Sequence, residues 1–333
     1  METSDRNDST KSIPAINGPV ATDALGATLM HEHVFVLTPA LQVAYPGFRG
    51  WDPDVQIPAA RRYLTELVGA GIDTIVDVTT VDTGRDVSHV LRAAEGTGLQ
   101  IVVATGMQTE RHLPRALSDE ARYPTPRTPE ELDELFMRDA TVGVQGTDVK
   151  AGIIKCASDL AGLTPDVERV LRASARVQVE TGLPITTHTH AQARTGFDQQ
   201  RVLAEEGADL ERVVIGHSGD TTDLDYLERL IAAGSIVGMD RFGEAGAMLV
   251  SLDERVDTIV SLCERGYADR IVISHDHCCY VDWVPRDQAP SPDGHQYISR
   301  AVLPRMRERG VTDEQIRQML VDTPRRLFEG RAS

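Results

Sequence analysis

The sequence predicts a single-domain α/β protein, a (β/α)8 barrel of parallel strands. Short apolar or β-branched runs alternate with stretches of helical spacing along nearly the whole chain, and no hairpin turn separates the runs. Eight runs occur, and eight is the number of strands that closes such a barrel. The runs cover residues 26–33, 73–80, 100–106, 150–157, 184–190, 212–219, 235–243 and 270–276.

Helix-boundary signals lie between these runs. Thr128-Pro129-Glu130 and Thr164-Pro165-Asp166 each combine a capping threonine, a proline at the first helical position and an acid in the first turn. Glycines typical of helix ends precede the next run at Gly182, Gly207, Gly234 and Gly266. An open doubly wound sheet is the alternative fold, but no Gly-x-Gly-x-x-Gly follows the first run.

Composition narrows the class of protein. The 333 residues fit one barrel domain, expected over 15–330, after a loose polar tail over 1–14. The net charge of -17 argues against nucleic acid or an anionic membrane as a partner. No apolar run is long enough to cross a membrane and no export signal opens the chain, so we expect a cytoplasmic protein. The four cysteines lack disulfide or zinc spacing and are expected to be reduced thiols.

Two histidines end the first predicted strand. Because side chains alternate along a strand, His31 and His33 share one face and Glu32 lies on the other. Two neutral imidazoles close together form half of a site for a first-row metal. Such a pair alone is more often a surface feature, so its meaning depends on the later strands.

Further charged residues and histidines end the later strands, where a barrel carries its active site: Lys155, His188, His217, Arg241 and Asp276. With the histidine pair they favour a metal site. Each residue has an alternative role taken alone. His188 shares its face with His190, so one of the two could be an internal histidine. His217 and Asp276 could each cap a following helix.

Lys155 is the unusual member of this set. A lysine at the end of an apolar strand is normally a surface residue, or a Schiff-base nucleophile in aldolase-type barrels. In a pocket of cations its pKa should fall, leaving a neutral amine that can add carbon dioxide. The resulting carbamate is a carboxylate, which could bridge two divalent ions.

Six segments together resemble the phosphotriesterase family of the amidohydrolase superfamily, most closely its phosphotriesterase-like lactonases. They are His31-Glu32-His33, AGIIKCASD around Lys155, THTHAQARTGFDQQ, IGHSGDTTD, GMDRFG and ISHDHCCYVDW. The resemblance covers the chain after the tail. It implies a TIM barrel, a homodimer and a binuclear centre of zinc, cobalt, manganese or iron.

The same resemblance implies a role for each residue. The expected ligands are His31, His33 and Asp276 for one ion, and His188 and His217 for the other. Carbamylated Lys155 and a hydroxide would bridge the ions. Asp276 would also handle the proton, and Arg241 would line the substrate pocket.

The sequence departs from the lactonases around the expected pocket. Gln108 and Glu110 follow the third strand where tyrosines are usual, and His277 replaces a tyrosine after the metal aspartate. If these three residues bind substrate, the pocket is more polar and less suited to long-chain N-acyl-homoserine lactones. The alternative is that Gln108 and Glu110 point to solvent and His277 is a buried, satisfied histidine.

The segment from Cys278 to about Gly294 reads as a long loop after the eighth strand, and such loops often cover a barrel mouth. Trp283 in this segment resembles a family tryptophan near the pocket and the subunit contact, but could equally pack on its own loop. Two closing helices, over 295–309 and 312–320, should seal the barrel.

These features predict a binuclear metal-dependent hydrolase that opens lactones, including N-acyl-homoserine lactones, with weak phosphotriesterase activity. A hydrolase of phosphotriesters or other esters on the same centre is the alternative. A metal-free Schiff-base aldolase using Lys155 and a non-catalytic sensor are further alternatives. The complete set of metal-ligand residue types argues against both.

Overall fold

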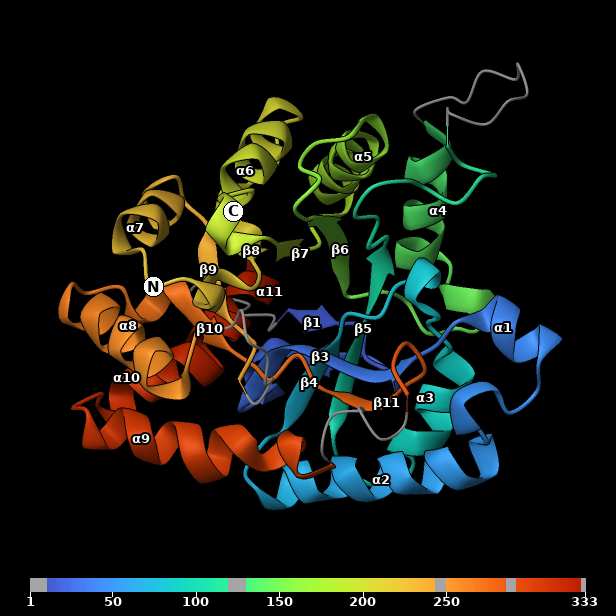
Figure 1. Cartoon of the computed structure of the whole chain (residues 1–333), viewed down its shortest axis with the longest axis horizontal. Helices are drawn as coiled ribbons and strands as arrows, with labels where there is room; N and C mark the ends of the chain where they lie inside the picture. The colour runs from blue at the N-terminus through green and yellow to red at the C-terminus, as the bar shows by residue number, and fades with distance from the viewer. Residues whose placement is uncertain (1–10, 119–129, 243–249, 286–291, 331–333) are drawn as a thin grey trace, which may run out of the picture.

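The computed structural model describes residues 11–118, 130–242, 250–285 and 292–330 and shows a (β/α)8 TIM barrel (Figure 1). Each of the eight predicted runs overlaps a strand, and neighbouring strands pair in parallel in chain order. The strands are β3 (Thr28–Val36), β4 (Thr74–Asp77), β5 (Gln100–Gly106), β6 (Ile153–Ser158), β7 (Ile185–Thr189), β8 (Val213–Ile215), β9 (Ile236–Met239) and β10 (Ile271–Ile273). The predicted fold class is confirmed.

A further strand closes the barrel. β11 (Cys278–Val281) continues the line of β10 and pairs in parallel with β3. The backbone N–H of Asp276 donates to the carbonyl of His31 (3.0 Å), and that of His33 to the carbonyl of His277 (2.9 Å). The predicted long loop is therefore wrong at its beginning, because these residues complete the hydrogen bonding of the first strand. Residues 286–291 of that predicted loop lie outside the described residues.

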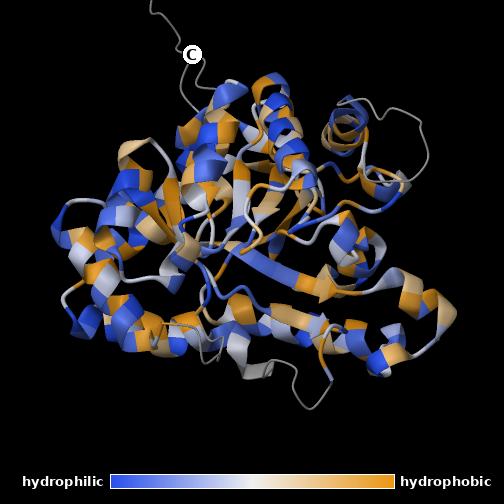
Figure 2. Ribbon diagram, turned by 45° about the horizontal axis from the view of Figure 1, so that its top comes forward, coloured by the Kyte–Doolittle hydropathy of each residue, from blue (hydrophilic) through white to orange (hydrophobic). Residues whose placement is uncertain are grey.

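The described helices between strands surround the barrel: α2 (Pro53–Gly69), α3 (Val87–Ala94), α4 (Glu130–Thr141), α5 (Pro165–Thr181), α6 (Gly196–Glu205), α7 (Leu224–Ala232) and α8 (Leu252–Glu264). Figure 2 shows hydrophilic and hydrophobic residues side by side on these helices, as expected of helices with one face on the strands. Thr164 caps α5 as predicted, its hydroxyl accepting from the N–H of Val167. The proposed cap Thr128 lies outside the described residues.

Both ends of the chain pack on the barrel. The closing segment forms α9 (Leu303–Glu308), α10 (Asp313–Arg317) and the unpredicted α11 (Thr323–Glu329). Near the start, β1 (Ser12–Ile13) pairs with β2 (Val20–Ala21), and Ile13 is buried, so the predicted tail ends earlier than residue 14. Among the described residues, no helix has the length and apolar character needed to span a membrane.

Candidate metal centre

All six predicted metal ligands meet at the carboxyl ends of the strands. His31 and His33 project inward from β3, Lys155 from β6, and His188 from β7. The two remaining predicted ligands, His217 and Asp276, follow β8 and β10. Five of the six line a cavity of about 340 Å³, and the sixth, Lys155, is fully buried behind His31.

Neighbouring groups orient three of the histidine rings. Asp240 lies 3.2 Å from Nδ1 of His31 and 2.9 Å from Nδ1 of His217. Nδ1 of His33 lies 2.7 Å from the hydroxyl oxygen of Thr79, which itself donates to Asp77. These partners favour the tautomer with the proton on Nδ1, so that each Nε2 carries a lone pair.

The lone pairs of the rings converge on other acceptor atoms. Oδ1 of Asp276 lies 3.3 Å from Nε2 of His33 and 3.6 Å from Nε2 of His31. Nε2 of His217 lies 3.0 Å from Nδ1 of His188. The other nitrogen of His188, Nε2, forms a hydrogen bond with Asp159 at 2.5 Å, which favours the lone pair on Nδ1. Acceptor atoms in contact repel each other unless a proton or a cation lies between them. Imidazole nitrogen and carboxylate oxygen are also the donor types that zinc and similar ions prefer, so these residues fit metal ions.

Lys155 is buried in this centre. Its Nζ lies 2.8 Å from Nε2 of His31, and its side chain is 0% exposed, which excludes a surface role. Burial lowers the pKa of Lys155 to about 8, although Asp276 and Asp240 act in the opposite direction. A substantial fraction of this amine is therefore neutral in mildly alkaline solution.

Asp276 is held in a fixed position beside the histidines. Its backbone is left-handed, with a φ of 56°, and Nε of Arg241 donates to its Oδ2 at 3.0 Å. Arg241 also donates through a second nitrogen to Asp220 at 2.9 Å. Burial acts to raise the pKa of Asp276, but His31, His217 and Arg241 together hold it well below its usual value. The group is thus a carboxylate, able to bind a cation or accept a proton.

The structure does not support a helix-capping role for His217 or Asp276. His217 precedes a short 3-10 turn, Ser218–Asp220, but its side chain makes no capping hydrogen bond. Asp276 is followed by β11 rather than a helix. His190 is the capping histidine, because its Nδ1 accepts from the N–H of Ala193.

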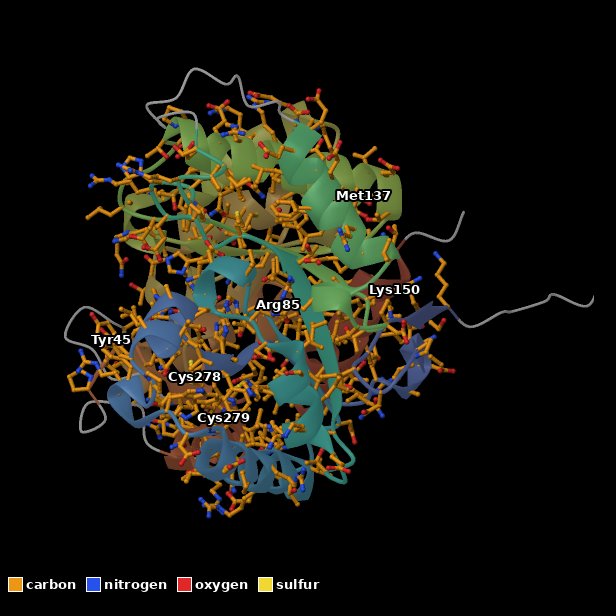
Figure 3. The ribbon with its side chains drawn as sticks, turned by 90° about the vertical axis from the view of Figure 1, so that its right-hand side faces the viewer. Tyr45, Arg85, Met137, Lys150, Cys278 and Cys279 are labelled. Carbon is orange, nitrogen blue, oxygen red and sulfur yellow. The ribbon has the colours of Figure 1, made fainter. Side chains whose placement is uncertain are left out.

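Four of the five residues predicted to bind substrate line the same cavity: Gln108, Glu110, Arg241 and Trp283. His277 does not line this cavity and is buried, which agrees with the alternative given for it above. Side chains alternate after Asp276, so Cys278 lines the cavity while the ring of His277 packs outside it against His295, with ring centroids 4.3 Å apart. In Figure 3, Cys278 and Cys279 lie nearer the centre of the view than Tyr45, which is 65% exposed.

Sequence reasoning missed the groups that orient the ligands. Asp240 follows β9 and Asp159 follows β6, so both stand at strand ends like the predicted ligands. A position at a strand end could have pointed to both residues, but it does not distinguish a metal ligand from a residue that orients a ligand. Glu32 was expected only to point away from the cavity. Its carboxylate accepts from the hydroxyl of Ser274, from both the N–H and Nδ1 of His275, and from the N–H of His277.

Known proteins match the chain along most of its length. The family model described as the phosphotriesterase family matches residues 11–328. A phosphotriesterase homology protein of Mycobacterium tuberculosis is 49% identical over 323 residues, which cover 95% of this chain and 98% of that protein. An aryldialkylphosphatase of Saccharolobus solfataricus is 35% identical over 309 residues, covering 91% of this chain and 95% of that protein.

A more distant relative and a solved structure also match the chain. An N-acetyltaurine hydrolase of Dictyostelium discoideum is 30% identical over 271 residues, covering 78% of this chain and 69% of that protein. A solved structure of the phosphotriesterase from Mycobacterium tuberculosis superposes with a TM-score of 0.90 at 48% identity, covering 96% of this chain and 98% of that one. The chain therefore belongs to the phosphotriesterase family of the amidohydrolase superfamily and is a hydrolase of ester-type bonds.

Proposed function

We propose that the protein is a binuclear metal-dependent hydrolase that opens lactones, N-acyl-homoserine lactones among them. The observation that carries this proposal is the convergence of imidazole nitrogens on each other and on a carboxylate. His31, His33 and Asp276 would hold one ion, and His188 and His217 the other. When bound, two divalent ions supply a hydroxide near neutral pH and polarise the carbonyl oxygen under attack.

We also propose that Lys155 is carbamylated in the active protein. The burial of its Nζ and its contact with His31 support this, since a neutral buried amine can add carbon dioxide. The product is an N-carboxylate, and the proton lost from the amine passes to solvent. A carboxylate at this position would give the two groups of ligands a shared anionic partner.

The residues of the chain then have separable tasks. Asp276 accepts the proton of the attacking water and returns a proton to the ring oxygen as the carbon–oxygen bond breaks, giving a hydroxy acid. Arg241 orients Asp276 through its Nε, while Asp220 holds the other end of the guanidinium. The walls formed by Gln108, Glu110 and Trp283 position the rest of the substrate.

Phosphotriester hydrolysis is the second candidate. The aryldialkylphosphatase relative supports it, and attack at phosphorus needs the same nucleophile and the same charge stabilisation as attack at a carbonyl carbon. We propose it as a weak activity beside lactone opening. The metal can be zinc, cobalt, manganese or iron, because histidine and carboxylate ligands accept all four.

A homodimer is the proposed assembly. Helix α1 (Pro39–Ala44) buries none of its residues, and Val43 and Tyr45 are 84% and 65% exposed. Figure 2 shows hydrophobic colours on this projecting segment. Apolar side chains of this size, gathered on one projection, are typical of a protein contact. Sedimentation of the wild type and of Val43→Asp would show a dimer and a monomer, respectively.

The function is tested by proton release on γ- and δ-lactones, homoserine lactones of graded acyl length and one phosphotriester. The assay compares metal-replete enzyme, chelated enzyme and Lys155→Ala. The proposal expects lactone turnover that is lost in both controls and a phosphotriester rate well below it. If no lactone is hydrolysed while metal stays bound, the substrate is another ester or an amide.

A further inference from the structure

An acidic side chain without a partner lies in the wall of the catalytic cavity. Glu110 lines the cavity together with the metal ligands. None of the residues that the structure describes forms a hydrogen bond or an ion pair with its carboxylate. The other acid of this wall, Asp276, is paired with Arg241 and faces His33. Glu110 therefore contributes a negative charge that the protein itself leaves unmatched.

A second carboxylate lies beside the first. Oxygens of Glu110 and Asp159 and a ring nitrogen of His188 all lie within 4.8 Å of one another. An oxygen of Asp159 also forms a hydrogen bond with Nε2 of His188 at 2.5 Å. Two acidic side chains so close together attract a positively charged group.

The cavity also offers an aromatic face. Trp283 lines it and is 51% exposed. The preceding residue, Asp282, is buried and accepts from the backbone N–H of Thr38 (2.8 Å) and from the amide of Gln42 (2.7 Å). These bonds fix the start of the loop that carries the indole. Indole faces attract ammonium groups, and this preference is independent of the two carboxylates.

The one arginine of the wall does not neutralise this region. Arg241 donates to Asp276 and to Asp220, so two carboxylates already compensate its charge. No lysine or other arginine lines the cavity among the described residues. The part of the cavity beside Glu110 is thus suited to a cation.

We infer that the substrates are esters or lactones that carry a protonated amine, whose ammonium group binds against Glu110, Asp159 and Trp283. This inference rests on the proposed hydrolase function and narrows its substrate class. The ammonium group takes no part in the reaction, keeps its proton and acts only through binding. The replacement of aromatic residues by Gln108 and Glu110 then changes the selectivity of the pocket from apolar chains to cationic ones.

The test uses three homoserine lactones whose acyl chains have equal length and end in an ammonium, a methyl or a carboxylate group. With metal-loaded enzyme, kcat/KM for the ammonium substrate should exceed that for the methyl substrate roughly tenfold, and the carboxylate substrate should be the poorest. Glu110→Gln and Trp283→Leu should each reduce this ratio roughly threefold. Glu134→Gln, which removes an exposed acid of α4, should leave the ratio unchanged and serves as the control.

Each outcome separates this inference from the function on which it rests. Equal kcat/KM values for the ammonium and methyl substrates would overturn the inference while supporting a lactonase. If every lactone is inert, calorimetry with hexylammonium and hexanoate still decides, because only the ammonium ion should bind and Glu110→Gln should weaken that binding. A third metal ion per chain that is lost in Glu110→Gln would also overturn the inference, since a metal ion would then occupy this place.

Discussion

The two sides of the cavity are built in different ways. On the metal side, the proposed ligands stand at strand ends and buried partners such as Asp240 and Thr79 orient their rings. On the substrate side, Gln108, Glu110 and Trp283 lie on segments beyond the strands, and the last two are exposed. Groups held by buried hydrogen bonds keep the geometry that the chemistry requires, whereas exposed groups can change without disturbing the barrel. Substitutions on the two sides should therefore differ greatly in effect.

The largest effect is expected for Asp276→Ala. This change would remove a proposed ligand, the proposed proton acceptor and the partner of Arg241 together, so kcat/KM for a lactone should fall by at least about a thousandfold. Initial rates measured with equal metal loading check it. A loss of less than tenfold would show that another group accepts the proton.

Glu32→Gln tests how much the hydrogen bonds of Glu32 stabilise the residues around Asp276. Glu32 accepts hydrogen bonds from Ser274, His275 and His277, on both sides of Asp276, and removing its buried charge should lower the free energy of unfolding by about 3 kcal/mol. Urea unfolding measures this change. Unfolding within about 0.5 kcal/mol of the wild type would contradict a stabilising role.

Glu32 should also make the stability of the folded protein depend on pH. Burial acts to raise the pKa of Glu32, but His275 and the hydrogen bonds hold it below its usual value. A lowered pKa in the folded state means that the stabilisation is present above the usual carboxyl range and is lost as the pH falls through the lowered value. The wild type should therefore lose its stability advantage over Glu32→Gln on acidification. The prediction would be contradicted if the difference in free energy of unfolding between the wild type and Glu32→Gln stayed constant as the pH falls from 7 to the onset of acid unfolding.

Asp240→Asn should act through the ligands rather than through the fold. Asp240 contacts Nδ1 of both His31 and His217, and the loss of such a partner typically weakens metal affinity tenfold to a hundredfold. Competition with a chelator measures the affinity. Wild-type affinity in this variant would show that the rings keep their tautomers without Asp240.

The smallest effect is expected on the substrate side. Gln108→Tyr adds apolar surface to the cavity and should raise kcat/KM for long-acyl lactones about fivefold, mainly through KM. A kinetic profile against acyl length checks it, with short-acyl lactones as the internal control. If the dependence of kcat/KM on acyl length does not change, the acyl chain does not bind next to residue 108.

Much of the metal side could be predicted from sequence because it depends on strand periodicity. His31, Lys155 and His188 each stand on a predicted strand, and the inward face of a barrel brings strand ends together whatever the loops do. The sequence left two roles open for His277 because β11 was taken for a loop. Once those residues pair with β3, alternation sends Asp276 and Cys278 inward and His277 outward. Strand pairing across the closure depends on the tertiary fold and leaves little local signal.

The partners of the ligands were harder to foresee for a similar reason. Asp240 and Thr79 act on rings from other strands, so their role depends on distances that sequence does not supply. Glu32 was placed on the correct face, but its bonds to Ser274 and His275 join residues more than 240 positions apart. Only the closed barrel brings these groups into contact.

The central claim is that the two groups of histidines and Lys155 form one binuclear centre. The most direct measurement is the number of metal ions per chain in purified wild-type protein and in Lys155→Ala, with and without added bicarbonate. The account predicts two ions per wild-type chain, fewer in Lys155→Ala, and recovery when a short carboxylic acid is added to that variant to replace the carbamate. Two tightly bound ions in Lys155→Ala, or full lactonase activity in wild-type protein that holds no metal, would contradict it.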